Sequence, residues 1–229
     1  MKKKIVALTG AGISAESGLA TFRGSDGLWE GHRIEDVATP EGWAANPGLV
    51  LDFYNQRRAA ARAAQPNAGH LALAALEQNF EVVVVTQNVD DLHERAGSNR
   101  VIHLHGKLFE SRSTRFEQLI YPMTSDRIEL GELCEKGHQL RPNIVWFGED
   151  VPLMEQAMEE AATADIFLVI GTSLQVYPAA GLVGYAPASC PVYLIDPSRP
   201  PVSARRNLRF ITEPASTGVP RVATELLAL

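Results

Sequence analysis

Cysteine is scarce in this sequence of 229 residues, and long apolar runs are missing. The two cysteines, Cys134 and Cys190, are too few for a disulfide framework, so we expect the reducing conditions of the cytoplasm. The longest apolar runs, Val82–Val85 and Ile166–Ile170, have the length of a strand and fall far short of the about 20 residues that span a bilayer. A strand-like run follows the first residues almost at once, so we expect neither a signal peptide nor a membrane partner.

An excess of positive charge is missing too. The chain has 21 Lys and Arg against 27 Asp and Glu, a formal net charge of −6 at pH 7. This balance argues against a nucleic-acid partner held mainly through its phosphates. The length fits one large domain, or one domain with a small inserted lobe.

Short apolar runs recur along the chain and alternate with helical patterns. The runs are Ile5–Leu8, Val82–Thr86, Ile144–Phe147, Ile166–Ile170, Val192–Ile195 and Leu208–Ile211, and the helical patterns are Asn67–Asn79, Pro152–Ala164 and Pro220–Leu229. The runs are continuous, as expected for strands covered on both faces. They predict an α/β fold with a doubly wound, mainly parallel, Rossmann-like sheet.

Two segments interrupt this alternation. Residues 28–65 are partly helical and aromatic, and residues 107–143 are polar and broken. Both are too long for ordinary connections, so we predict that they form a small lobe. The large lobe would then consist of residues 1–27, 66–106 and 144–229. A cleft between the lobe and the carboxyl edge of the sheet would be the ligand site.

The turn after the first predicted strand lacks the third glycine of the usual dinucleotide fingerprint. Gly10 and Gly12 fit the G-x-G-x-x-G pattern, but Ala15 takes the third glycine position. A strand, a glycine turn and a helix start would present backbone N–H groups to a phosphate, although a tight turn in any α/β protein explains the glycines equally well. Phe22 and Arg23 follow the turn closely and could cover a bound dinucleotide.

Ligand-type residues also follow three later strands. They are Gln87, Asn88 and Asp90 after one strand, Gly171, Thr172 and Ser173 after a second, and Asp196 after a third. Amide and carboxylate groups could bind a carboxamide or ribose hydroxyls, while Asp90 could instead cap the next helix. Three such strand ends favour a dinucleotide site over coincidence.

Two histidines, His103 and His105, alternate in the run Val101–Gly106, so they would face opposite ways if the run is extended. A neutral histidine facing the cleft could act as a general base near pH 7, whereas most lone histidines are structural. His105 is the better candidate for the base, because Gly106 gives the backbone room at the edge of a site.

In their order along the chain, these segments resemble the sirtuins, which are NAD-dependent protein lysine deacylases. The matching segments are Gly10–Gly18, Thr21–Arg23, Thr86–His93, Leu104–Gly106, Val145–Glu149 and Gly171–Ala179. The resemblance implies one catalytic domain over residues 1–229 that acts on acylated lysines of cellular proteins. It implies that NAD is consumed as a co-substrate, giving nicotinamide, O-acyl-ADP-ribose and free lysine.

The resemblance also implies a role for each matching residue. His105 would be the catalytic base. The residues that bind NAD would be Gly10, Ala11, Gly12, Ile13, Ser14, Glu16, Thr21, Phe22, Arg23, Gln87, Asn88, Asp90, Gly171, Thr172, Ser173, Asp196 and Ala215. The acyl-lysine peptide would add as a strand along Val145, Trp146, Phe147 and Gly148. Asp196 and Glu213 depart from the asparagine and glycine usual in the family.

Tyr54 and Arg57 lie three residues apart, so they share a face if their segment is helical. Family members that remove succinyl or malonyl groups carry Tyr-x-x-Arg at this place. The resemblance therefore implies removal of these acidic groups as well as of acetyl groups. The acyl carboxylate would pair with Arg57 and hydrogen-bond Tyr54. The alternative, an exposed arginine on an amphipathic helix, fits the matching position less well, and Arg58 would face elsewhere.

The metal ligands of the family are missing. Typical sirtuins hold zinc in the small lobe with two pairs of cysteines, but residues 108–114 have none, and the second region keeps Cys134 with His138 nearby. Two ligands cannot complete a four-coordinate zinc site, so we expect no zinc. Packing of Leu119, Tyr121 and Ile128 would then hold the lobe.

Two other functions stay open at this point. One is an NAD hydrolase or ADP-ribosyltransferase with the same pocket, and the other is a non-catalytic NAD-sensing module. The intact His105, Asn88 and Asp90 argue against a module that only senses NAD. We expect a monomer.

Overall fold

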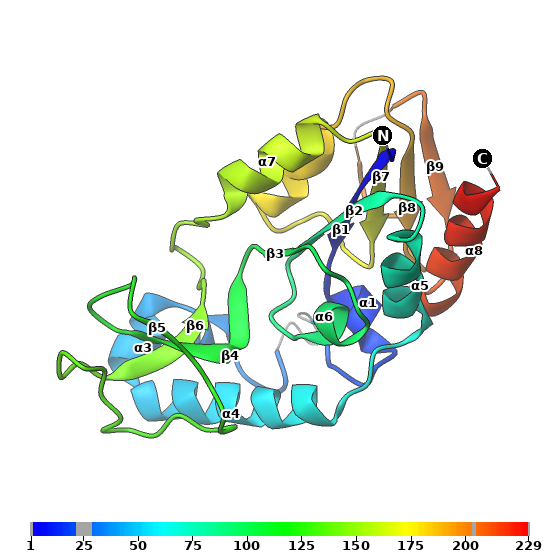
Figure 1. Cartoon of the computed structure of the whole chain (residues 1–229). Helices are drawn as coiled ribbons and strands as arrows, with labels where there is room; N and C mark the ends of the chain where they lie inside the picture. Colours follow the sequence, from blue (N-terminus) through cyan, green and yellow to red (C-terminus); the bar gives the residue numbers. More distant parts are fainter. Residues whose placement is uncertain (1, 22–28, 203–204, 229) are drawn as a thin grey trace.

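The computed structural model describes residues 2–21, 29–202 and 205–228, and within them the main sheet has six strands (Figure 1). These strands are β1 (Lys4–Thr9), β2 (Glu81–Thr86), β3 (Val101–His103), β7 (Ile166–Ile170), β8 (Val192–Ile195) and β9 (Leu208–Ile211). Their order is β3-β2-β1-β7-β8-β9, and each neighbouring pair is parallel. The predicted doubly wound parallel sheet is confirmed.

Helices cover both faces of this sheet (Figure 1). One face carries α1 (Ala11–Ala15), α5 (Ala68–Leu76) and α8 (Ala215–Leu227), the other carries α7 (Met154–Ala162) and the 3₁₀ helix η1 (Ala179–Gly184), and the short α6 (Leu92–Arg95) follows β2. Alternate residues of β1 enter the two apolar clusters: Ile5 and Ala7 pack toward α5 and α8, Val6 and Leu8 toward α7 and η1. Burial on both faces explains why these strands are continuously apolar.

Two predicted elements differ from the observed ones. The strand expected at Ile144–Phe147 is wrong, because β6 (Leu140–Ile144) ends at Ile144 and belongs to a separate antiparallel sheet. After this strand, the Trp146 N–H donates to the Glu149 carboxylate at 2.8 Å, so it takes no part in a strand ladder. The last helix begins at Ala215 instead of Pro220, since Pro220 in its second turn removes only one backbone hydrogen bond.

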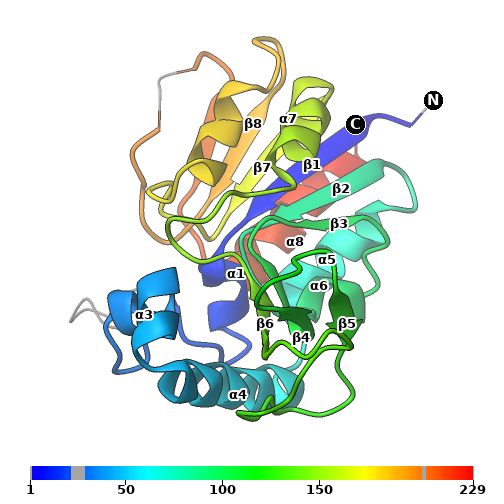
Figure 2. The ribbon, with the colours of Figure 1, turned by 90° about the vertical axis from the view of Figure 1, so that its left-hand side faces the viewer.

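A smaller body lies beside the carboxyl edge of the main sheet (Figure 2). It contains α2 (Ile34–Val37), α3 (Pro40–Ala45), α4 (Pro47–Ala63) and a sheet of β5 (Ile120–Pro122), β4 (Gly106–Ser113) and β6 in that order. Its own apolar cluster includes Val50, Phe53, Leu108 and Trp146. We call this body the small lobe, and its residue boundaries stay a prediction.

Arg58 holds the small lobe together through buried hydrogen bonds. Its side chain is fully buried, and its guanidinium donates to the carbonyl of Leu108 on β4, to Asn55 Oδ1 and, at 2.9 Å, to the carbonyl of Asp126. Asn55 in turn donates to the carbonyl of Ile128 at 3.1 Å and accepts from its N–H at 2.9 Å. Burial lowers the pKa of Arg58 to about 10. A buried cation bonded to carbonyls thus links α4 to β4 and to the 126–128 loop.

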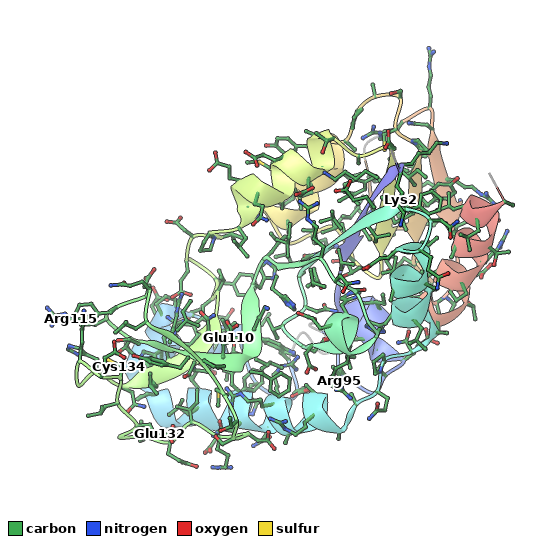
Figure 3. All side chains as sticks on the ribbon, in the orientation of Figure 1. Lys2, Arg95, Glu110, Arg115, Glu132 and Cys134 are labelled. Carbon is green, nitrogen blue, oxygen red and sulfur yellow. The ribbon has the colours of Figure 1, made fainter. Side chains whose placement is uncertain are left out.

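The region of Cys134 and His138, which the resemblance compares with a zinc site, packs through contacts within the chain. Cys134 is buried, with its Sγ 3.4 Å from Ser113 Oγ, at the end of the small lobe far from the main sheet (Figure 3). Within the described residues, no three His, Cys, Asp or Glu side chains gather as metal ligands would. Ile128 is buried as predicted, while Leu119 and Tyr121 are half-buried.

Arg95 supports the junction between the lobes. It donates to the carbonyls of Ala61 and Ala64 at 3.0 and 2.5 Å, so α6 is tied to the end of α4 (Figure 3). None of the helices in the described ranges combines the length and apolarity needed to cross a membrane.

We expect Arg58→Met to lower the free energy of unfolding by about 3 kcal/mol, because buried carbonyls would lose their donor. The matched control is Arg62→Met on the same helix, where the side chain is 49% exposed; it should cost less than about 1 kcal/mol. Urea unfolding measures both variants. Equal losses would contradict the role given to Arg58.

Candidate functional site

A cavity of about 420 Å³ lies between the carboxyl edge of the main sheet and the small lobe. The turns that follow β1, β2, β7 and β8 all contribute to its lining. The chain runs from β1 outward to β2 and later returns to place β7 on the other side of β1. Open α/β folds bind their ligands at such a reversal of strand order.

Most of the predicted site residues line this cavity. From the catalytic and NAD-binding sets they are Gly10, Ala11, Gly12, Ser14, Thr21, Gln87, Asn88, Asp90, His105, Gly171, Thr172, Ser173 and Asp196, and from the substrate set Tyr54, Arg57, Val145, Trp146, Phe147 and Gly148. The predicted Phe22 and Arg23 lie outside the described residues. The fold therefore brings together residues from distant parts of the chain.

Three predicted NAD-binding residues lie away from the cavity lining. Ile13 and Ala215 are buried in the apolar cluster beneath α5 and α8. Glu16 accepts hydrogen bonds from Ser216, from its N–H at 3.1 Å and its hydroxyl at 2.6 Å. These residues join α1 to the start of α8, so they support the glycine turn from behind.

The glycine turns after β1 and β7 contact each other directly. A Cβ on Gly10 would lie 2.7 Å from the carbonyl oxygen of Gly171, and one on Gly12 would lie 2.6 Å from its Cα. Gly171 has φ +58°, in the region that favours glycine. The N–H of Gly12 donates to the Gly171 carbonyl at 2.8 Å, and the N–H of Ile13 to the Gly10 carbonyl at 3.1 Å. The amides of Gly12 and Ile13 are therefore used within the protein, and the expectation that the turn offers backbone N–H groups to a phosphate stays a prediction.

A buried hydrogen-bond network joins this turn to the loop after β2. The Asn88 side-chain amide donates to the Gly10 carbonyl at 3.1 Å and to Ser14 Oγ at 3.0 Å, and Ser14 Oγ donates to Asp90 at 3.1 Å. Both N–H groups of Asn88 are used, which leaves its side-chain oxygen for a ligand. Burial raises the pKa of Asp90, and the hydrogen bonds from Leu92 N–H and Ser14 only partly oppose this.

His105 is held in one tautomer by the same loop. Its Nδ1 lies 3.0 Å from the carbonyl oxygen of Gln87, which can only accept, so Nδ1 carries the proton and Nε2 has the lone pair. Burial lowers the pKa of His105, although the Gln87 carbonyl pulls in the opposite direction. The ring is therefore neutral at pH 7, as a general base requires.

His103 lies outside the cavity lining and holds the loop from behind. Its Nδ1 is 3.1 Å from the Asn88 carbonyl oxygen and its Nε2 is 2.7 Å from Glu94 Oε1. The His103 ring therefore bridges the Asn88 carbonyl and the Glu94 carboxylate. Burial alone would raise the pKa of Glu94, but the hydrogen bond and charge of His103 keep it below its ordinary value. The two histidines thus have the different surroundings that their alternation predicted.

Tyr54 and Arg57 share the face of α4 that borders the cavity, while Arg58 points into the small lobe. The Arg57 guanidinium lies 4.4 Å from the centre of the Trp29 ring, and its Nη1 is 3.1 Å from Glu30 Oε1. Burial lowers the pKa of Arg57, whereas Glu30 and other nearby groups raise it. The Tyr54 hydroxyl accepts from Trp146 Nε1 at 3.2 Å and so keeps its own proton to donate. Burial raises the pKa of Tyr54 well above its usual range.

The wall at Val145–Gly148 is a loop whose N–H groups are largely used. The Val145 N–H donates to the His105 carbonyl at 2.9 Å, and the Phe147 N–H to the Ala38 carbonyl at 3.0 Å. Trp146 is fixed by Arg141, whose guanidinium lies 3.2 Å from the ring centre. A peptide strand along this wall would therefore have to pair with its carbonyl oxygens and with the N–H of Gly148.

Several lining residues were missed by reasoning from the sequence. They are Leu19, Ala20, Trp29, Ala38, Val89, Ile144, Glu149, Val151, Gln175, Val176, Tyr177 and Pro178. A signal existed for Val89, Glu149 and residues 175–178, which fall within matching motifs. No local pattern marks Ala38 or Trp29, which reach the cavity only through the packing of the small lobe.

Comparison with known proteins was made by sequence and by structure. The chain matches the model of the Sir2 family over residues 10–178. A Helicobacter pylori protein named NAD-dependent protein deacylase is 52% identical over 213 residues, which cover 93% of each chain. A Bacteroides thetaiotaomicron protein of the same name is 49% identical over 223 residues, 95% of each chain.

Solved structures give the same result. A Sir2 homolog in complex with NAD has a TM-score of 0.89 at 39% identity, covering 99% of this chain and 90% of that one. A Sir2 protein with a p53 peptide and NAD+ has a TM-score of 0.81 at 30% identity, covering 100% and 95%. By family match, sequence identity and fold, this chain belongs to the Sir2 family, the sirtuins.

Proposed function

We propose that this chain is an NAD-dependent protein lysine deacylase that passes the acyl group to ADP-ribose. The observation that carries the proposal is one cavity that the neutral His105 lines together with two sets of residues. The set from the main sheet is suited to NAD, and the set from α4 and the Val145–Gly148 loop is suited to an acylated lysine. Relatives named NAD-dependent protein deacylase and a Sir2 homolog solved with NAD support it.

The residues on the sheet side of the cavity fit NAD by their chemistry. The Gln87 amide donates to the Thr172 hydroxyl at 3.0 Å, so two ribose-binding side chains meet between β2 and β7. Asp196 uses Oδ1 for Ser198, which leaves Oδ2 to accept from a ribose hydroxyl. Asp90 and the oxygen of Asn88 are suited to a carboxamide. When bound, NAD supplies an electrophilic ribose carbon and the group that carries the acyl away.

His105 would be the general base in this reaction. Its Nε2 lone pair would take a proton from a ribose hydroxyl, which could then attack the acyl carbon. The Gln87 carbonyl would hold the ring by Nδ1 throughout, and it would stabilise the imidazolium that forms.

The acid side of the pH profile should reflect His105. A general base must be deprotonated, so activity is present above its pKa and lost as the pH falls through it. Because burial lowers that pKa, we expect the fall in kcat/KM to be centred below the ordinary value of 6.5. Initial rates with an acetyl-lysine peptide between about pH 5 and 8 test this. A fall centred above about pH 7 would contradict the assignment.

His105→Ala should reduce kcat at least about 100-fold, because the base is lost while the NAD lining remains. The control is His138→Ala, because the His138 ring packs on Phe116 in the small lobe and does not line the cavity; its kcat should stay close to that of the wild type. Mass spectrometry should find O-acyl-ADP-ribose with the control variant. NAD cleavage with acyl peptide present but without this product would instead favour an NAD hydrolase or ADP-ribosyltransferase.

We further propose that the acyl groups include succinyl and malonyl. Arg57 is a cation on the cavity lining whose side chain is 11% exposed, and within the described residues its Nε has no hydrogen-bond partner. Tyr54 beside it has a proton to donate. Such a pair suits an acyl chain that ends in a carboxylate, because charged hydrogen bonds are strongest where water is excluded.

Arg57→Met should lower kcat/KM for a succinyl peptide about tenfold or more relative to the matching acetyl peptide. The acidic group would lose its cation, while the acetyl group has no charge to lose. Arg62→Met, one turn or so further along α4 and half exposed, should leave the ratio unchanged. Equal losses for both peptides would refute the acyl role of Arg57.

The remaining proposals concern partners and location. We propose that acylated lysines of other proteins bind along Val145–Gly148, as the p53 peptide bound to a Sir2 protein suggests by analogy. The two unpaired cysteines support a cytoplasmic location, and the net charge of −6 argues against a nucleic-acid partner, while the monomer stays a prediction.

A further inference from the structure

Arg57 already has a carboxylate partner inside the chain. Glu30 Oε1 lies 3.1 Å from its Nη1, and within the described residues Glu30 is the sole carboxylate in ion-pair contact with it. The contact is made beside the cavity that Trp29, Tyr54 and Arg57 line. An acidic acyl group would therefore meet a cation that is already neutralised.

The two partners differ in how firmly they are held. The Arg57 side chain is 11% exposed, and its guanidinium lies against the rings of Trp29 and Phe53 at 4.4 and 5.8 Å from their centres. The Glu30 side chain is 32% exposed. Breaking the ion pair therefore costs less free energy when the Glu30 side chain moves into water than when the Arg57 side chain leaves its place against the rings.

The backbone around Glu30 forms a tight turn. Glu30 has φ +49° and Gly31 φ +81°, and Trp29 and His32 close the turn with hydrogen bonds of 2.9 and 3.1 Å. The turn fixes the position of the Glu30 Cα and Cβ atoms, and the rotamer of the Glu30 side chain determines whether its carboxylate reaches Arg57. The glutamate can release Arg57 without unfolding the turn.

We propose that Glu30 is a specificity-determining residue whose carboxylate occupies the place on Arg57 that the end of a succinyl or malonyl group needs. This inference rests on the proposed function, in which Arg57 binds the acyl carboxylate. Glu30 competes with acidic acyl groups and leaves acetyl groups unaffected, because a neutral acetyl group can bind with the pair intact.

The competition multiplies the intrinsic affinity for acidic acyl groups by the fraction of molecules in which Arg57 is free, so the apparent affinity falls as that fraction falls. Removing the carboxylate at position 30 raises that fraction. If Glu30 instead only supported Arg57, its removal would disturb the cation and weaken binding of acidic acyl groups. The two roles therefore predict opposite changes in acyl preference.

The first experiment compares kcat/KM for succinyl- and acetyl-lysine peptides of one sequence. Glu30→Gln should raise the succinyl-to-acetyl ratio about fivefold, the size expected for a partly exposed ion pair. Glu30→Asn, suited to the positive φ, should act in the same direction and guards against misfolding of the first variant. The matched control is Glu35→Gln, because Glu35 pairs with Arg33 at 3.6 Å with both side chains 69% exposed; its ratio should not change. An unchanged or lower ratio in both Glu30 variants would overturn the proposal.

The second experiment repeats Glu30→Gln in the Arg57→Met background. The change in ratio should vanish there, since no cation remains to compete for; a persisting increase would overturn the proposal. The two hypotheses fail differently. If Arg57→Met alone leaves the ratio unchanged, the acyl role of Arg57 is wrong; if it lowers the ratio but the Glu30 variants do not raise it, only the competition by Glu30 is wrong.

Discussion

The contact between two glycine turns is the constraint on which the site depends. Gly10 and Gly12 approach the backbone of Gly171 so closely that no side chain fits between them. This contact brings the carboxyl ends of β1 and β7 together at the reversal of strand order. It also places Thr172 against Gln87 and leaves Ser14 beside Asn88. The glycines therefore shape the ligand site mainly by letting two backbone turns of the protein touch each other.

From this contact, hydrogen bonds run outward to the proposed base. The Gly10 carbonyl accepts from Asn88, whose own carbonyl meets His103, while the neighbouring Gln87 carbonyl fixes His105. The loop after β2 is thus held on both sides, by the glycine turn and by the contact of His103 with Glu94. The side of the cavity proposed to bind the acyl group has another origin: α4 supplies Arg57, and the buried Arg58 joins that helix to β4. Under the proposed function, the sheet would position NAD, and the lobe held by the buried Arg58 would select the acyl group.

Reasoning from the sequence succeeded where a local pattern has a single spatial outcome. Parallel strands end at the same edge of a sheet, so polar residues after β2, β7 and β8 had to meet. Reasoning from the sequence failed at Ile144–Phe147. There the apolar run continues beyond the end of β6, because Trp146 packs into the small lobe and not into a sheet. The resemblance also assigned Ile13 and Ala215 to NAD, although both face the core, because a residue-by-residue likeness does not separate supporting residues from lining ones.

The sequence by itself determined the family, the α/β architecture, the histidine at the cavity and the Tyr-x-x-Arg face of α4. These follow from periodicity and motif, which are properties of neighbouring residues. Only the tertiary structure decided which groups pair over long distances: Glu30 with Arg57, Arg58 with Leu108, and His103 with the carbonyl of Asn88. It also decided the tautomer of His105, because a proton's place on a ring depends on the acceptor that packing brings to it.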